Sequence, residues 1–82
     1  MSKRSSFDIK KRILTLIKSS PLTFAQLERK TNTGFLTIKN NCEELKLYGF
    51  IGIEKQKKHP KSGRPYSIIK ITEKGLEFIK EL

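Results

Sequence analysis

The sequence predicts a small α+β domain that is mostly helical, with three helices, a β-hairpin and a final helix. Apolar residues recur at helical spacing up to Tyr48 and alternate with polar residues from Ile51 onward. Pro and Gly residues separate these segments. Because 82 residues suffice for one small domain only, we expect a basic arm at residues 1–6 and a single domain at residues 7–82.

The first predicted helix covers residues 7–18. Ser5 or Ser6 can cap its N-terminus, and Asp8 lies in the first turn, where the helix dipole favours a carboxylate. Pro21 ends the segment because it cannot continue the hydrogen-bond ladder. The apolar residues at helical spacing are Ile9, Ile13, Leu14, Leu16 and Ile17.

A short second helix is predicted at residues 24–30. Thr23 precedes this helix, and Gln26 follows three residues later, which is the spacing of a capping box. A turn follows, because Asn32 tolerates left-handed backbone angles and Gly34 adopts them freely.

The third helix is predicted at residues 34–48, and Gly49 ends it because a left-handed residue closes the last turn. The spacing of its apolar residues predicts that one face packs on the core. That face consists of Phe35, Ile38, Cys42 and Leu45.

The alternation that begins at Ile51 predicts a strand. Residues 57–65 are polar, basic and broken by Pro and Gly, which indicates a loop, and residues 66–71 predict a second strand. Together they form a β-hairpin. Thr72 caps a last helix at residues 73–82. Its candidates for the inward face are Leu76, Phe78 and Ile79.

The charge favours a polyanionic partner. There are 18 Lys and Arg against 8 Asp and Glu, a net charge of +10. Residues 1–12 and 51–65 each hold five basic residues and one carboxylate, so each carries +4. We expect nucleic acid as the partner, with a solubilising surface as the alternative. Membrane binding is not expected, because the basic segments lack a bulky apolar face.

The sequence offers little for catalysis or metal binding. A single His and a single Cys exclude a Cys/His metal cluster and an internal disulfide. Cys42 falls on the predicted apolar face, which indicates a packed thiol. We therefore expect no enzyme, no cofactor and no metal. The basic start of the chain is not followed by an apolar stretch of signal-peptide length, so we expect a cytoplasmic, nucleoid-associated protein.

Five short stretches carry a resemblance to a known family. They are residues 22–27 (LTFAQL), 31–32 (TN) and 45–51 (LKLYGFI), Tyr66, and residues 71–75 (ITEKG). In this order and spacing the chain resembles the winged helix-turn-helix DNA-binding family, especially small archaeal transcriptional regulators and chromatin-associated proteins. The resemblance covers residues 9–82. It implies that helix 34–48 lies in the major groove and that the hairpin is a wing.

The resemblance also indicates which residues of helix 34–48 face DNA. Asn side chains can pair with adenine, and the Thr methyl group can contact thymine. The alternative is a merely solvated face. The part of this helix nearest its N-terminus has no Arg, which argues against guanine readout. The candidates are Thr37, Asn40 and Asn41 for base contacts and Lys39 for a phosphate.

The predicted wing and the N-terminal arm supply the other candidates. Gly63-Arg64-Pro65 resembles the core of an AT-hook, although an ordinary turn explains it as well, and a narrow A·T minor groove attracts an Arg such as Arg64. The wing candidates are Lys55, Lys57, Lys58, Lys61 and Arg64. The arm candidates are Lys3 and Arg4.

The sequence thus predicts a regulator of transcription that binds double-stranded DNA. The alternatives are a sequence-tolerant chromatin protein and a protein-interaction module on the same fold. We also expect a homodimer through helix 7–18 and the C-terminal helix. The apolar residues of helix 7–18 span more than one face, which one core cannot easily use, and a dimer doubles the base contacts.

Overall fold

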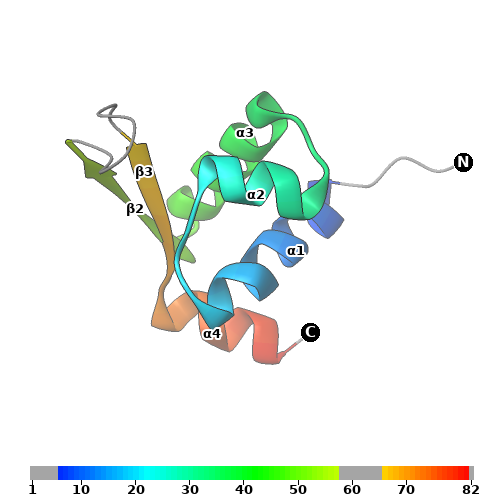
Figure 1. Ribbon diagram of the computed structural model, residues 1–82. Coiled ribbons are helices and arrows are strands. Elements are labelled where there is room, and N and C mark those ends of the chain that lie inside the picture. The colour runs from blue at the N-terminus through cyan, green and yellow to red at the C-terminus, as the bar shows by residue number, and fades with distance from the viewer. Residues whose placement is uncertain (1–5, 58–65, 82) are drawn as a thin grey trace, which may run out of the picture.

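The helices and strands follow one another in the order that the sequence predicts, with one additional short strand (Figure 1). The computed structural model describes residues 6–57 and 66–81. The elements are α1 (Ser6–Ser19), β1 (Leu22–Thr23), α2 (Phe24–Thr31), α3 (Phe35–Leu47), β2 (Ile51–Gln56), β3 (Tyr66–Ile71) and α4 (Glu73–Lys80). Within these residues, none of the helices combines the length and apolar character that crossing a bilayer requires.

Helix α1 lies at the centre of the fold. It contacts α2, α3, α4 and β3, and Figure 1 shows it running between the other helices. Its residues Ile9, Ile13, Leu14 and Ile17 are all buried in the core, and Leu16 packs partly against it. The predicted dimer interface assumed that one core cannot easily use all the apolar residues of helix 7–18, and this assumption is wrong. One core does use the apolar residues of this helix, because neighbouring elements cover it on several sides.

The start of α2 and the turn between α2 and α3 are built largely as predicted. The Thr23 hydroxyl accepts a hydrogen bond from the Gln26 amide at 3.2 Å, and the Gln26 side chain accepts one from the Thr23 amide at 2.9 Å. This confirms the capping box. Asn32 takes the left-handed position with φ 52°, whereas Gly34 is extended and precedes α3.

Helix α3 packs on α1 and α2 through a narrower apolar face than predicted. Ile38, Cys42 and Leu45 are buried, which confirms most of that face. Phe35 was expected beside them but is 48% exposed. It lies at the N-terminal end of α3, where its ring and that of Phe24 pack edge to face with 5.7 Å between the ring centroids.

Strand β3 lies in the middle of a three-stranded antiparallel sheet of order β1-β3-β2. The predicted hairpin is confirmed: β2 pairs with β3 from Ile51 opposite Ile71 to Gln56 opposite Tyr66. The additional strand β1 pairs with the other edge of β3, with Leu22 opposite Ile69. Because Leu22 and Ile69 are both buried, this short strand anchors the hairpin to the helical core.

The end of α3 and the start of α4 meet at the turn before β2. Gly49 has φ 82°, as expected for the residue that closes a helix. The hydroxyl of Thr72 donates to the Gly49 carbonyl at 2.6 Å, and the amide of Thr72 donates to the Phe50 carbonyl at 3.0 Å. Thr72 also accepts from the Gly75 amide at 3.1 Å, which confirms the predicted cap. A Cβ at Gly75 would collide with the Phe50 carbonyl oxygen, so only glycine fits.

Candidate nucleic-acid interface

The outward face of α3 carries a row of exposed side chains. Successive residues of a helix are about 100° apart, so positions spaced by four, three and four fall on one side. On α3 that side lies opposite the buried residues Ile38 and Leu45. The residues of this outward face are Leu36, Asn40, Glu43 and Leu47, all exposed.

Three of the four helix residues predicted to contact DNA are exposed. Thr37 and Asn40 lie on the solvent side of α3, and Lys39 lies on its flank towards the hairpin. The structure therefore makes all three side chains accessible to a partner. Their contacts with bases and phosphates stay predictions.

The expectation that Asn41 faces away from the core is wrong. Its side chain is 5% exposed. The carboxamide oxygen accepts a hydrogen bond from Lys10 Nζ at 2.9 Å, and its nitrogen donates to the Thr37 carbonyl at 2.8 Å. Asn41 lies three residues after Ile38 and four before Leu45, which places it on the inward side of α3. Its amide faces α1 and is not available to a base.

Lys10 connects α1 to α3 through a second contact. Its ammonium group lies 2.8 Å from Glu44 Oε1, and the Lys10 side chain is only 13% exposed. Lys10 thus bridges Asn41 and Glu44, which lie three residues apart on α3. We call these three residues the Lys10 bridge. The Lys10 bridge therefore connects α3 to α1 by polar contacts, beside the apolar contacts of the core.

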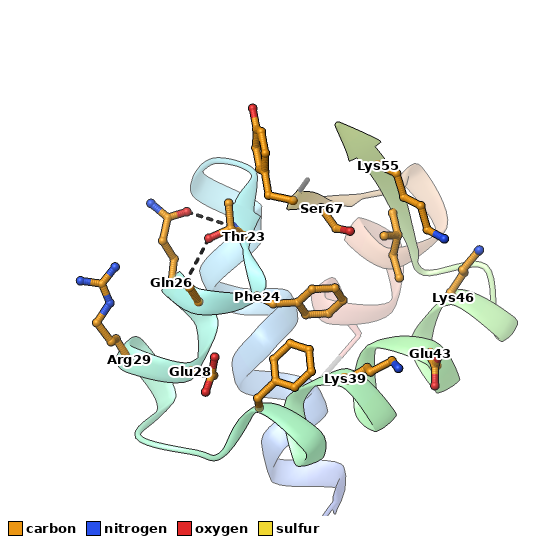
Figure 2. Close-up of a pocket in the computed structure, with 14 residues that line it drawn as sticks. Thr23, Phe24, Gln26, Glu28, Arg29, Lys39, Glu43, Lys46, Lys55 and Ser67 are labelled. Carbon is orange, nitrogen blue, oxygen red and sulfur yellow. Dashed lines mark hydrogen bonds between the residues drawn. The ribbon is translucent and has the colours of Figure 1, made fainter. Parts of the chain in front are cut away.

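A groove of about 1130 Å³ separates α3 from the hairpin. Figure 2 shows Phe24 in the middle of the groove, between α2 and the strands. The exposed ring of Phe35 lines it beside Phe24. The side chains that line it are Thr23, Phe24, Ala25, Gln26, Glu28, Arg29, Phe35, Lys39, Glu43, Lys46, Ile53, Lys55, Tyr66 and Ser67.

Positive charge predominates along this groove. Its cationic residues are Arg29, Lys39, Lys46 and Lys55, and its carboxylates are Glu28 and Glu43. In Figure 2 the ammonium groups of Lys46, from α3, and Lys55, from β2, lie at the same end of the groove. Sequence reasoning missed Lys46, although its spacing of seven from Lys39 places both on one side of the helix.

The structure describes only part of the predicted wing and, of the predicted arm, only Ser6, which belongs to α1. Lys55 belongs to β2, and Lys57 follows that strand; both side chains are exposed. A neighbouring pair on the hairpin, Lys70 and Glu54, forms an ion pair across β2 and β3 with both side chains about half exposed. The candidates outside the described residues are Lys3, Arg4, Lys58, Lys61 and Arg64.

Cys42 is a packed thiol, as the sequence predicts. Its side chain is fully buried on the inward face of α3. Burial raises the pKa of the Cys42 thiol to about 12, and the charge of Glu43 adds to the shift. The thiol therefore stays protonated at neutral pH, and the thiolate that would act as a nucleophile is not populated.

Solved structures of transcriptional regulators share this arrangement. The regulator TA0346 from Thermoplasma acidophilum aligns with 93% of this chain at a TM-score of 0.84 and 20% identity. A regulator homologue from Pyrococcus horikoshii OT3 aligns with 89% at 0.76 and 18% identity. A point mutant of ZitR from Lactococcus lactis, solved in complex with DNA, aligns with 96% at 0.74 and 19% identity.

These alignments concern the fold, because the identities are low. The chain spans 77%, 70% and 50% of the lengths of the three solved chains, respectively. It matches no protein-family model. No curated protein matches it either. Helices α2 and α3 with their three-residue turn, followed by the β2–β3 hairpin and α4, together with these structures, identify the fold as a winged helix-turn-helix.

Proposed function

We propose that the protein regulates transcription by binding double-stranded DNA. Helix α3 enters the major groove, and the wing contacts the backbone or the minor groove. The observation that carries this proposal is the exposed face of α3 beside a groove rimmed by Lys39, Lys46 and Lys55, in a chain of net charge +10. The DNA-bound state of ZitR, a structure with the same fold, supports it.

In this proposal the exposed Asn and Thr side chains contact bases and the cationic side chains contact phosphates. Asn40 and Thr37 contact base edges, since both side chains stand clear of the core. The cations of the groove and of the β2 end bind phosphates, because one DNA strand follows the channel between α3 and the hairpin. These phosphate-binding residues are Lys39, Lys46, Lys55 and Lys57. The candidates Lys58, Lys61, Arg64, Lys3 and Arg4 lie outside the described residues and stay predicted DNA contacts.

Salt dependence of duplex binding tests the proposal directly. We expect the logarithm of the affinity to fall linearly with the logarithm of salt concentration, with about six to ten phosphate contacts contributing. Replacing Lys46→Ala or Lys55→Ala removes about one contact each and lowers the slope by about 0.9. Lys80→Ala is the matched control, because Lys80 lies on α4, across α1 from α3 in Figure 1. No binding to duplexes at low salt, or a flat salt profile, contradicts the proposal.

A sequence-tolerant DNA-binding protein is the second candidate function. It is favoured by the charge of α3, where Lys39 and Lys46 are balanced by Glu43 and Glu44. Net attraction to DNA must then come from other elements, which contact the backbone and carry no base preference. Selection of bound duplexes from a random pool separates the two. An enriched motif supports the regulator, and no enrichment supports the sequence-tolerant protein.

We further propose that the protein acts as a homodimer through α1 and α4. The support is the doubling of contacts on a palindromic site, together with an apolar groove of about 440 Å³ to which α1 contributes Phe7 and α4 contributes Phe78. Phe7 is half exposed and available to a second copy. Sedimentation equilibrium at micromolar concentration tests this. A mass near 9.5 kDa throughout refutes the dimer.

A further inference from the structure

Two leucines stand on the outward face of α3, where a surface helix ordinarily carries polar residues. Leu36 is 67% exposed and Leu47 is 84% exposed. Among the described residues, neither joins the core cluster or the apolar side chains that pack on it. Folding of this domain therefore does not explain why an apolar side chain occupies position 36.

Leu36 differs in this respect from the preceding residue. The ring of Phe35 is also exposed, but it meets Phe24 edge to face within the groove. Leu36 is rotated by about 100° from Phe35 and faces outward with Asn40, one turn further along α3. The Cβ atoms of residues four apart on a helix lie about 6 Å from each other. The apolar side chain of Leu36 and the hydrogen-bonding amide of Asn40 thus lie next to each other on one face of α3.

We propose that Leu36 contacts the 5-methyl group of a thymine while Asn40 binds an adenine. The inference rests on the proposed placement of α3 in the major groove. Thymine is the base that presents a methyl group there, and apolar side chains recognise it. Adenine presents N6 and N7, which match the carboxamide of Asn. Because stacked base pairs are about 3.4 Å apart, side chains about 6 Å apart contact base pairs one or two steps apart.

The pair therefore selects a short stretch of duplex that contains A·T pairs. Leu36 loses its contact with water when it meets a thymine methyl group, which favours binding. A cytosine at the same position offers an amino donor and no methyl group. Leu36 is in this way a specificity-determining residue whose contribution is apolar, next to the polar contribution of Asn40.

Replacing thymine by uracil tests the inference, because uracil lacks the methyl group and keeps every hydrogen-bonding group. The probe is the duplex selected most strongly from a random pool, with its thymines replaced one at a time. At one or two positions we expect the wild-type protein to bind the uracil duplex about fourfold more weakly, the effect of one buried carbon. Leu36→Ala should bind the thymine and uracil duplexes equally.

Two variants serve as controls. Leu47→Ala removes an equally large exposed side chain about 16 Å further along the same face, and it should keep the fourfold ratio. Asn40→Ala should lose the preference for adenine and keep the ratio. Thermal melting shows whether each variant is folded, which we expect because the side chains are exposed.

Two results overturn the inference alone. One is wild-type binding that does not change at any uracil position, and the other is a fourfold ratio that persists in Leu36→Ala. If no duplex is bound at low salt, the proposed function fails and the inference fails with it. The binding assay itself therefore separates the two failures.

Discussion

Asn40 and Asn41 are neighbours in the sequence and occupy opposite environments in the structure. Asn40 is exposed on the outward face of α3, whereas Asn41 is buried and hydrogen-bonded at both ends of its carboxamide. A rotation of about 100° between consecutive residues is enough to separate them. The angular position relative to α1, not the residue type, thus decides which polar side chains of α3 a partner can reach.

The two sides of α3 differ in the same way along its length. The inward side joins apolar packing to the Lys10 bridge, which is polar and only partly shielded from solvent. The outward side carries the exposed Leu36 and Asn40. Substitutions on the inward side should change stability, and substitutions on the outward side should change binding. Four measurements test this division.

The largest difference is expected between Ile38→Ala and Leu36→Ala. Ile38 is fully buried, so truncation leaves a cavity and lowers the free energy of unfolding by about 2–5 kcal/mol. Leu36 is mostly exposed, and its truncation should change stability by no more than about 0.5 kcal/mol. Urea unfolding of both variants checks this. Similar losses in the two would contradict the assignment of the faces.

The two asparagines give the next contrast. Asn41→Ala leaves Lys10 without one of its acceptors and should lower the free energy of unfolding by about 1–3 kcal/mol. Asn40→Ala should stay within about 0.5 kcal/mol of the wild type and alter the preferred DNA sequence instead. Chemical denaturation and duplex selection on both variants measure the two effects. An Asn41→Ala variant of full stability would show that the contacts of Asn41 contribute nothing to stability.

Alkaline pH should destabilise the inward side through Cys42. Unfolded, the thiol ionises near its ordinary pKa of 9.0, whereas burial raises the pKa in the folded chain to about 12. The stabilisation that comes from keeping this thiol protonated is complete below pH 9 and is lost as the pH rises from 9 towards 12. The loss reaches about 1.4 kcal/mol at pH 10. Cys42→Ala lacks this titration. The stability difference between wild type and Cys42→Ala should therefore shrink from pH 8 to pH 10, and parallel curves would rule the effect out.

The smallest effect concerns the ion pair of Lys10 with Glu44. Because Glu44 is half exposed, we expect a coupling of about 0.5–1 kcal/mol that weakens with added salt. A double-mutant cycle with Lys10→Met and Glu44→Gln isolates it. A cycle with Lys11→Met, an exposed lysine on the same helix, is the control and should show no coupling to Glu44.

Local signals predicted most of the fold. Thr23 with Gln26, Asn32, Gly49 and Thr72 each mark a helix boundary through contacts within a few residues, and the structure places a cap or a left-handed residue at each. After Gly49 the apolar residues change from helical spacing to alternation with polar residues, and this local change predicted the hairpin. Features that depend on neighbouring residues are visible in the sequence.

The features that sequence reasoning missed depend on distant segments. Strand β1 is only two residues long, and it is extended against β3, which lies more than 40 residues later. Asn41 is buried because Lys10, on another helix, supplies a partner for its amide. Its spacing from Ile38 and Leu45 was visible, but the sequence does not show that Lys10 lies opposite it. Phe35 has core spacing, yet its ring packs on Phe24 in the groove and stays half exposed, a placement that periodicity does not reveal.

The joint between Gly49, Phe50, Thr72 and Gly75 has a mechanical consequence. Two hydrogen bonds and a backbone approach too close for any side chain connect the base of the hairpin to the first turn of α4. A rotation of β2 and β3 about that base would break these contacts unless α4 turned with them. The hairpin and α4 are thus joined at one closely packed turn, and α1 contacts both β3 and α4. A side chain introduced at Gly75 would therefore disturb the base of the hairpin and the first turn of α4 together.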